Sequence, residues 1–186
     1  MSVAIEQFQE SQSSHTSQYL TFILGSEEYG VEILKVQEIR GFGAVTKIPN
    51  TPDYVLGVIN LRGAIIPIID LRIRFALESV EYTPTTVIIV ATVKLRDRTR
   101  TIGIVVDAVS EVYNIEDSCL QPSPDFGCNI DTAFVSHLAN IEGKLIILMA
   151  IERLISNEVL TNIAETMPQE NTDKAKSASQ ESERSK

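Results

Sequence analysis

Residues 57–71, GVINLRGAIIPIIDL, decide the fold of this 186-residue chain. Two apolar, β-branched runs, 58–61 and 64–69, flank Arg62 and Gly63, a pattern typical of two strands joined by a tight turn. Gly63 can adopt the positive φ angle that such a turn requires. The stretch therefore predicts a largely buried β-hairpin whose tip carries a permanently charged side chain. Because a core needs no arginine, the tip is the first place to look for a function.

The composition favours a mainly β globular protein. Hydrophobic residues make up 44% of the chain and charged residues 22%, and tryptophan is absent, so the core must consist mostly of Val, Ile and Leu. The net charge of −9 argues against a nucleic-acid partner, which would require a basic face. No apolar run approaches the roughly 20 residues of a membrane-spanning helix, so direct insertion into a membrane is not expected.

The two ends of the chain differ from its centre. Residues 1–17 are rich in Gln, Ser and Glu, lack the pattern of a secretion signal, and are predicted to be disordered. Residues 157–167 could form an amphipathic helix, and the remainder to residue 186 is predicted to be disordered. Cys119 and Cys128 are too few and too far apart for a disulfide framework or a zinc knuckle, which is compatible with a cytoplasmic location.

The intervening sequence contains an internal repeat. The segment 29–39, YGVEILKVQEI, aligns with 102–112, IGIVVDAVSEV, at an offset of 73 residues. The segment 60–70, NLRGAIIPIID, aligns with 140–150, NIEGKLIILMA, at an offset of 80. Short strands at this spacing, duplicated in one chain, predict two small β-barrels packed on each other. The first would occupy about 18–80 and the second about 84–156, and the alignment leaves open an exchange of strands between them.

One segment is ambiguous, and two others have the composition of connections. The apolar positions of 33–42, ILKVQEIRGF, fit a short helical turn and an irregular strand equally well. Residues 76–85 have the composition of a linker, and Lys94–Arg100 that of a charged turn between two strands.

No pattern in the sequence indicates catalysis. The chain has neither a phosphate-binding glycine loop nor a nucleophile elbow, and its histidines, His15 and His137, have no metal-ligand spacing. Glu38 and Asp70 are expected to be solvated or capping carboxylates rather than an acid–base pair. We therefore expect no enzyme activity, no cofactor and no metal, and the sequence favours a binding module.

A duplicated β protein can bind a partner in the groove between its modules. Val36 and Ile39, with Glu38 between them, would line such a groove if the segment is exposed, and their repeat counterparts Val109 and Val112 would lie opposite or at the far end of it. The alternatives remain open that these four apolar side chains belong to the core, that Arg62 is a solvated turn residue, and that 94–100 is a solvated hairpin end.

The ordered part of the chain resembles the CheW family of chemotaxis coupling proteins. The resemblance covers about residues 18–156 and is most specific in EILKVQEIRG (32–41) and GVINLRGAIIPIIDLR (57–72). It implies two SH3-like, five-stranded β-barrel subdomains with short helices. It also implies a non-catalytic bacterial adaptor, cytoplasmic and recruited to receptor arrays. Such an adaptor links the cytoplasmic tip of methyl-accepting chemoreceptors to the histidine kinase CheA, whose regulatory domain has the same fold.

The resemblance also implies two sets of site residues. Those expected to bind the receptor are Val36, Glu38, Ile39, Arg62, Val109 and Val112. Those expected to bind the kinase, at the outer ends of the barrels, are Phe42, Val45, Gly57 and Phe126. The chain departs from its relatives at Gln121, where they carry a basic residue, and in the longer turn at 94–100. A coupling protein of another receptor–kinase pathway, such as twitching motility or second-messenger control, remains the alternative function.

Overall fold

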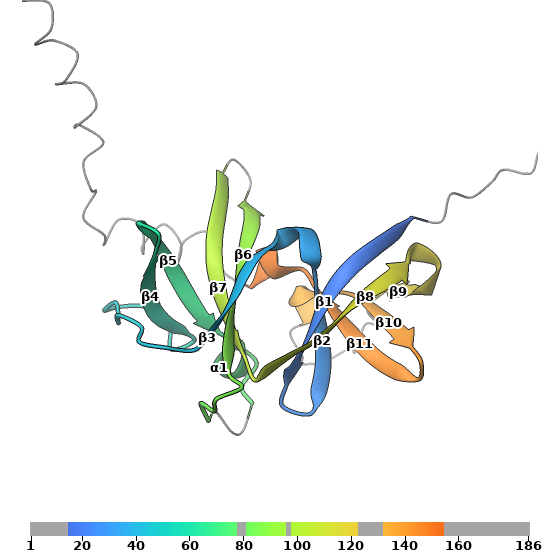
Figure 1. Cartoon of the computed structure of the whole chain (residues 1–186), viewed down its shortest axis with the longest axis horizontal. Helices are drawn as coiled ribbons and strands as arrows, with labels where there is room; N and C mark the ends of the chain where they lie inside the picture. The colour runs from blue at the N-terminus through green and yellow to red at the C-terminus, as the bar shows by residue number, and fades with distance from the viewer. Residues whose placement is uncertain (1–14, 78–80, 96–97, 123–131, 155–186) are drawn as a thin grey trace, which may run out of the picture.

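The computed structural model describes residues 15–77, 81–95, 98–122 and 132–154 (Figure 1). These residues form two β-sheets with a few single helical turns, so the prediction of a mainly β fold is confirmed. Figure 1 shows the two sheets side by side as separate units. Phe126, Cys128 and the predicted helix at 157–167 lie outside the described residues.

The first unit is a five-stranded sheet with the strand order β3-β6-β7-β5-β4. Its strands are β3 (Val36–Gly41), β4 (Val55–Leu61), β5 (Ala64–Asp70), β6 (Val87–Leu95) and β7 (Arg98–Val106). The predicted hairpin at 57–71 is β4 and β5, which pair antiparallel with Leu61 opposite Ala64. A short helix, α1 (Leu71–Arg74), follows β5 directly.

The second unit is a six-stranded sheet with the strand order β8-β1-β2-β11-β10-β9. Its strands are β1 (Thr16–Leu24), β2 (Glu27–Glu32), β8 (Ala108–Glu116), β9 (Leu120–Pro122), β10 (Val135–Ile141) and β11 (Lys144–Met149). Single 3-10 turns join the elements: η1 (Ile33–Lys35), η2 (Asp117–Cys119), η3 (Thr132–Phe134) and η4 (Ile151–Arg153).

The two sheets exchange strands across the predicted boundary near residue 80. β1 and β2 lie in the second unit with β8 to β11, whereas β6 and β7 complete the first unit beside β3 and β5. The division into 18–80 and 84–156 therefore does not separate the sheets, and exchange, the alternative left open, is the observed arrangement. The chain crosses between the units at η1, between β2 and β3, and at Asp107, between β7 and β8.

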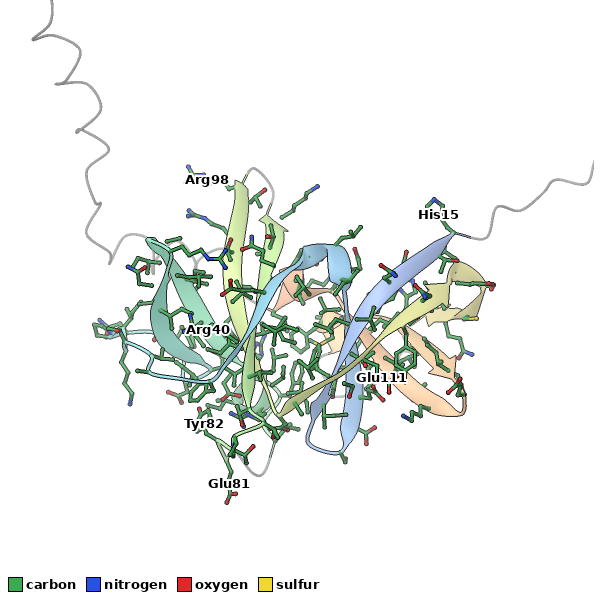
Figure 2. The ribbon with its side chains drawn as sticks, viewed as in Figure 1. His15, Arg40, Glu81, Tyr82, Arg98 and Glu111 are labelled. Carbon is green, nitrogen blue, oxygen red and sulfur yellow. The ribbon has the colours of Figure 1, made fainter. Side chains whose placement is uncertain are left out.

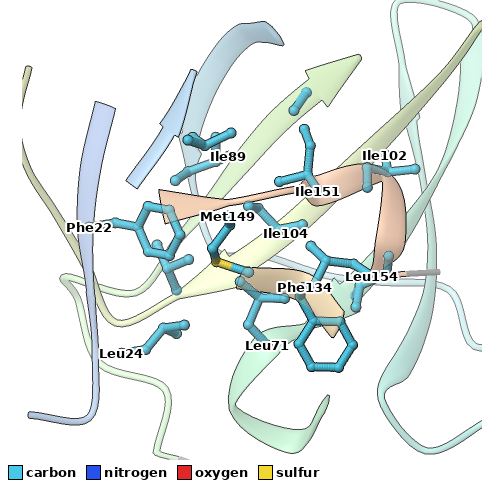
Figure 3. Close-up of a cluster of buried hydrophobic side chains, with 14 of the residues drawn as sticks. Phe22, Leu24, Leu71, Ile89, Ile102, Ile104, Phe134, Met149, Ile151 and Leu154 are labelled. Carbon is cyan, nitrogen blue, oxygen red and sulfur yellow. The ribbon is translucent and has the colours of Figure 1, made fainter. Parts of the chain in front are cut away.

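Each unit has a core of its own, and a larger core lies between them. Six buried aliphatic side chains fill the first unit, among them Ile66, Ile68 and Val105. The second unit encloses a smaller cluster that includes Ile115 and Leu148. The largest cluster joins side chains from both units, as Figure 3 shows for Phe22, Leu71, Ile104 and Phe134. Neither unit buries all of its apolar surface alone, which explains why they occur as one body.

Two glycines mark the repeat in three dimensions. Gly103 of β7 lies opposite Ile68 of β5, and Gly30 of β2 lies opposite Leu148 of β11, each in a parallel strand pair. A Cβ atom on Gly103 would be 2.5 Å from Ile68 Cδ1, and one on Gly30 would be 2.8 Å from Leu148 Cδ2. At both positions the side chain of the parallel neighbour lies so close that a larger residue would force it to shift, so glycine is favoured for the same reason.

Two local predictions need correction, and one ambiguity is resolved. Thr16 and Ser17, predicted to be disordered, begin β1 because they pair with β8. The ambiguous segment 33–42 is a 3-10 turn followed by a strand, so both readings apply to part of it. The described part of the predicted linker is not a free connection, because Tyr82 is held by Asp70 and stacks on Phe42.

Candidate functional site

β3 and β8 are the edge strands of their sheets, and both border the core between the units. Cross-strand partners share a face of a sheet, so Val36 and Ile39, opposite Ala91 and Ile89, face that core. By the same rule Val112 lies on the face of its partner Leu20, a residue of the same core. We call the surface formed by Val36, Ile39, Val109 and Val112 the β3–β8 face.

The four side chains divide into an inner and an outer pair. Val36 and Val109 are half-buried and pack against the core between the units. Ile39 is 44% exposed and Val112 is 48% exposed, which is unusual for large apolar side chains. The repeat relates Val36 to Val109 and Ile39 to Val112, so the two units present equivalent apolar pairs. The alternative that these side chains belong to the core therefore holds for Val36 and Val109 only.

Glu38 and Arg62 lie on the opposite side of β3 from Ile39. Glu38 pairs with Val90, whose side chain points into the core of the first unit. Arg62 Nη2 donates a hydrogen bond of 2.6 Å to Glu38 Oε2, which ties the tip of the β4–β5 hairpin to β3. The residues predicted to bind the receptor therefore fall into two groups. Four of them form the β3–β8 face, and the Arg62–Glu38 ion pair lies on the other side of β3.

The ion pair is asymmetric in its exposure. The Arg62 side chain is 82% exposed and that of Glu38 is 22% exposed, so the guanidinium remains accessible to a partner. Arg62 has a φ of 52° and Gly63 a φ of 88°, both in the left-handed region of a two-residue hairpin turn. Such a turn prefers Asn or Gly at the first position. Arginine is therefore present despite the turn chemistry, and not because of it.

The residues expected to bind the kinase gather at one end of the first unit. Phe42 and Val45 are half-buried against its core. Gly57 is buried and has a φ of 139°, and a Cβ atom there would clash with the backbone carbonyl of Thr46. Gly57 thus supports the loop that carries Val45 and does not itself offer a side-chain contact. Phe126, expected on the second unit, is outside the described residues.

A buried charge cluster behind this end was missed by the sequence analysis. Arg72 and Asp70 are both 0% exposed. Arg72 donates from Nε and Nη2 to the two carboxylate oxygens of Asp70, at 3.0 and 2.7 Å, and from Nη1 to Asp107 Oδ1 at 3.1 Å. Burial opposes the charge of Arg72, but its bonds to Asp70 and Asp107 raise its pKa overall. Asp70 also caps α1, as expected, although it is not solvated.

The buried charge cluster connects the second unit to the end of the first unit that carries Phe42. The other carboxylate oxygen of Asp107, Oδ2, accepts a 2.7 Å bond from the backbone N–H of Gly25 in the second unit. The Arg72 guanidinium lies 4.6 Å from the centroid of the Tyr82 ring, which stacks on Phe42 at 4.2 Å. Burial, followed by the nearby Asp70 carboxylate, raises the pKa of Tyr82. Asp107 thus connects the strand crossing to the candidate kinase surface through Arg72 and Tyr82.

The turn η1, where the chain first crosses between the units, was also overlooked. Lys35 Nζ forms ion pairs with Glu152 of η4 at 2.8 Å and with Glu32 at 3.0 Å. Burial alone would lower the pKa of Lys35, but these two partners raise it overall. The neighbouring Leu34 is 94% exposed. The sequence did not predict this exposure, because Leu34 is an apolar residue in the ambiguous segment 33–42.

Among the described residues, no three or more His, Cys, Asp or Glu side chains come close enough to hold a metal ion. In the same part of the chain, no helix has the length and apolar character needed to cross a membrane.

Comparisons with known proteins agree on one family. A family model described as "CheW-like domain" matches residues 18–159. The chain is 45% identical over 152 residues to a chemotaxis protein CheW of Klebsiella aerogenes, a match covering 80% of this chain and 89% of that protein. It is 40% identical over 139 residues to a chemotaxis protein CheW of Rhizobium meliloti, covering 75% and 87%.

A solved structure is similar as well. The crystal structure of the scaffolding protein TtCheW from Thermoanaerobacter tengcongensis matches with a TM-score of 0.69 and 35% identity. The match covers 78% of this chain and 96% of that one. The family match begins within β1 and ends beyond η4, so it includes both sheets.

Proposed function

The chain belongs to the CheW-like family, and we propose that it is a non-catalytic scaffold that couples bacterial chemoreceptors to the histidine kinase CheA. Two of its relatives are named as chemotaxis proteins and a structural neighbour as a scaffolding protein, which supports chemotaxis over another receptor–kinase pathway. The proposal assigns one surface to each partner and places the protein at receptor arrays on the cytoplasmic side of the membrane.

The observation that carries the proposal is the β3–β8 face. Ile39 and Val112 leave apolar surface exposed on two edge strands that border a common core. Apolar surface between two packed units suits an amphipathic helix, which inserts its apolar stripe between the exposed side chains. The receptors that bind CheW proteins end in a helical hairpin at their cytoplasmic tip. We propose that one helix of this hairpin binds the β3–β8 face.

Glu38 and Arg62 have a supporting role in this scheme. Their ion pair holds β3, the strand that carries Val36 and Ile39, against the hairpin tip of the first unit. Because the ion pair lies on the opposite side of β3 from Ile39, it positions the β3–β8 face without being part of it. The exposed guanidinium of Arg62 is free to bind an acidic group on either partner. An exposed pair of this kind contributes only about 0.2–1 kcal/mol to stability, so its value lies in geometry.

We place the kinase contact at the end of the first unit formed by Phe42 and Val45. Val45 lies on a loop whose backbone is held by Gly57, and Phe42 is fixed by its stacking on Tyr82. A rigid, half-exposed apolar surface with an aromatic anchor is typical of the centre of a protein interface. The regulatory domain of the kinase, which shares this fold in the family, is the proposed partner.

The test is a pair of binding measurements with single-residue variants. Val112→Asp would place a charge at the centre of the receptor surface and is expected to weaken co-sedimentation with receptor-containing vesicles by about 10-fold or more. It should leave binding to the isolated kinase regulatory domain unchanged. Val45→Asp is expected to give the reverse pattern.

Leu145→Asp is the matched control. Leu145 lies on β11 of the second unit and is 51% exposed, close to the exposure of Val112, but it is not part of the β3–β8 face. The control should retain both interactions. Loss of receptor binding by Leu145→Asp as well as Val112→Asp, or by neither, would contradict the assignment of the surface.

A further inference from the structure

The end of the β6–β7 hairpin is a two-stranded ribbon that extends beyond the strands on either side of it, although Gln37 of β3 donates a hydrogen bond of 2.6 Å to Thr92 near its base. β6 pairs with β3 only as far as Ala91, opposite Val36, and β7 pairs with β5 only from Gly103 onward. Residues 92–95 and 98–101 therefore pair only with each other among the described strands. Four residues of β strand extend about 13 Å. Figure 1 shows this ribbon rising past the start of β3.

The ribbon carries cations that have no partner in the described part of the chain. Lys94 and Arg98 are exposed, Arg100 is half-buried, and none of them forms an ion pair with a described carboxylate. By contrast, Lys35 and Arg62 on the body of the protein are paired with glutamates. On a chain with a net charge of −9, three unpaired cations at one projecting end form a distinct basic site. Figure 2 shows Arg98 at the free end of the ribbon.

The ribbon stands beside one end of the β3–β8 face. Val36 lies opposite Ala91, Ala91 lies opposite Ile102, and Arg100 is the next residue of β7 on that side of the sheet. Arg98 continues the same row toward the free end. From strand spacing, the Cα atoms of Val36 and Arg100 are roughly 12 Å apart, about the diameter of a helix. A helix that lies on Val36 and runs on past exposed Leu34 therefore passes within reach of the ribbon.

We propose that this ribbon is an electrostatic arm for the helical partner of the β3–β8 face, with Arg98 and Arg100, the two cations on the Val36 side of the ribbon, pairing with carboxylates on that helix. The inference rests on the proposed function and adds the charge of the partner. It identifies the partner as an amphipathic helix with acidic residues beside its apolar stripe. A partner with that charge is repelled by the rest of this acidic protein, so the arm also orients its approach.

Two other anionic partners fit the ribbon less well. Attachment to an anionic lipid surface needs a cluster of about 4–8 basic residues, and the four basic residues of 94–100 only reach the lower end of that range on a chain whose net charge of −9 opposes it. Binding to nucleic acid commonly uses about 6–10 phosphate contacts, more than the described ribbon can supply. Two arginines on one face suit a small number of carboxylates on a partner that is already held by apolar contacts.

The test compares two charge-reversed forms of the full chain. Arg98→Glu with Arg100→Glu alters the ribbon on the face of Val36, and Lys47→Glu with Lys144→Glu makes the same change in net charge at exposed lysines that form no ion pair with a described residue. Both are assayed by co-sedimentation with chemoreceptor-containing vesicles of neutral lipid, at low and at high salt. The ribbon variant is expected to bind about 3- to 10-fold more weakly than the control at low salt, and the difference should disappear at high salt.

Three outcomes would overturn the inference. Equal binding by the ribbon variant and the control would show that the ribbon contacts no acidic partner. Binding of the unaltered chain to receptor-free anionic vesicles, lost in the ribbon variant, would identify a lipid surface as the ligand. A chain that does not bind receptor vesicles at all would refute the proposed function too. If Val112→Asp weakens receptor binding but the ribbon variant does not, only the inference about the ribbon is refuted and the proposed function stands.

Discussion

Replacing Arg72 by methionine is the most informative perturbation of the fold. Arg72 is fully buried at the junction of the two units and donates four hydrogen bonds, to Asp70 twice, to Asp107 and to the carbonyl of Glu81. Methionine fills a similar volume but leaves the buried Asp70 carboxylate with only its bonds from Tyr82 and the backbone of residue 72.

The expected cost follows from the charge left behind. Removing one partner of a buried ion pair costs about 3–5 kcal/mol, because the remaining charge stays desolvated and unpaired. With a urea dependence of about 2 kcal/mol per molar, the unfolding midpoint should fall by roughly 2 M. Lysine at the same position keeps the positive charge but cannot form the two-pronged contact with Asp70, so Arg72→Lys should fall between methionine and the parent.

Urea unfolding followed by far-ultraviolet circular dichroism measures this effect without needing a tryptophan, which the chain lacks. If Arg72→Met proves too unstable to purify, Arg72→Lys still provides the comparison with the parent. A methionine variant within about 1 kcal/mol of the parent would refute the reasoning, because the cluster would then not hold the junction. An Arg72→Lys variant less stable than Arg72→Met would also refute the reasoning, because the positive charge at position 72 would then not stabilise the fold.

Three further predictions concern packing, turn geometry and pH. Gly103→Ala should lower stability by about 1–3 kcal/mol, and trimming its neighbour with Ile68→Val should restore part of the loss, as thermal unfolding of the double variant will show. Arg62→Asn should unfold within about 0.5 kcal/mol of the parent because asparagine tolerates the positive φ there, whereas a loss well above 1 kcal/mol would mean that the ion pair with Glu38 contributes more to stability than an exposed pair does. Burial raises the pKa of Tyr29, and burial together with the Asp70 carboxylate raises that of Tyr82, above the usual value of 10.0. The protonated phenols therefore stabilise the folded state fully below pH about 10, and this contribution is lost as the pH rises through the folded pKa values, so the urea midpoint should fall in strongly alkaline buffer; a midpoint unchanged there would contradict both shifts.

The local elements were predictable where the sequence carries a direct signal. The hairpin at 57–71 became β4 and β5 because its apolar runs and the Arg62-Gly63 turn specify strands and their register. The repeat was also visible, and its glycines, Gly30 and Gly103, occupy equivalent places. The assignment of strands to sheets was not predictable, since alternation shows that a segment is a strand but not which distant strand it joins.

The candidate site shows a similar division. Strand alternation places Glu38 and Ile39 on opposite faces of β3, a signal that was available in the sequence and that separates the ion pair from the apolar face. The burial of Arg72 had no such signal, because it depends on Asp107, which is 35 residues away. Lys35 likewise pairs with Glu152 only after the two units have packed.

The scaffold function is tested most directly by a three-component measurement. Receptor-containing vesicles are mixed with the kinase and with either the parent chain or its Val112→Asp form, and the kinase that sediments is measured. We predict that the parent chain carries the kinase to the vesicles, that Val112→Asp leaves it in solution, and that the Leu145→Asp control behaves as the parent. Sedimentation of the kinase to the same extent with the parent and with Val112→Asp would contradict the account.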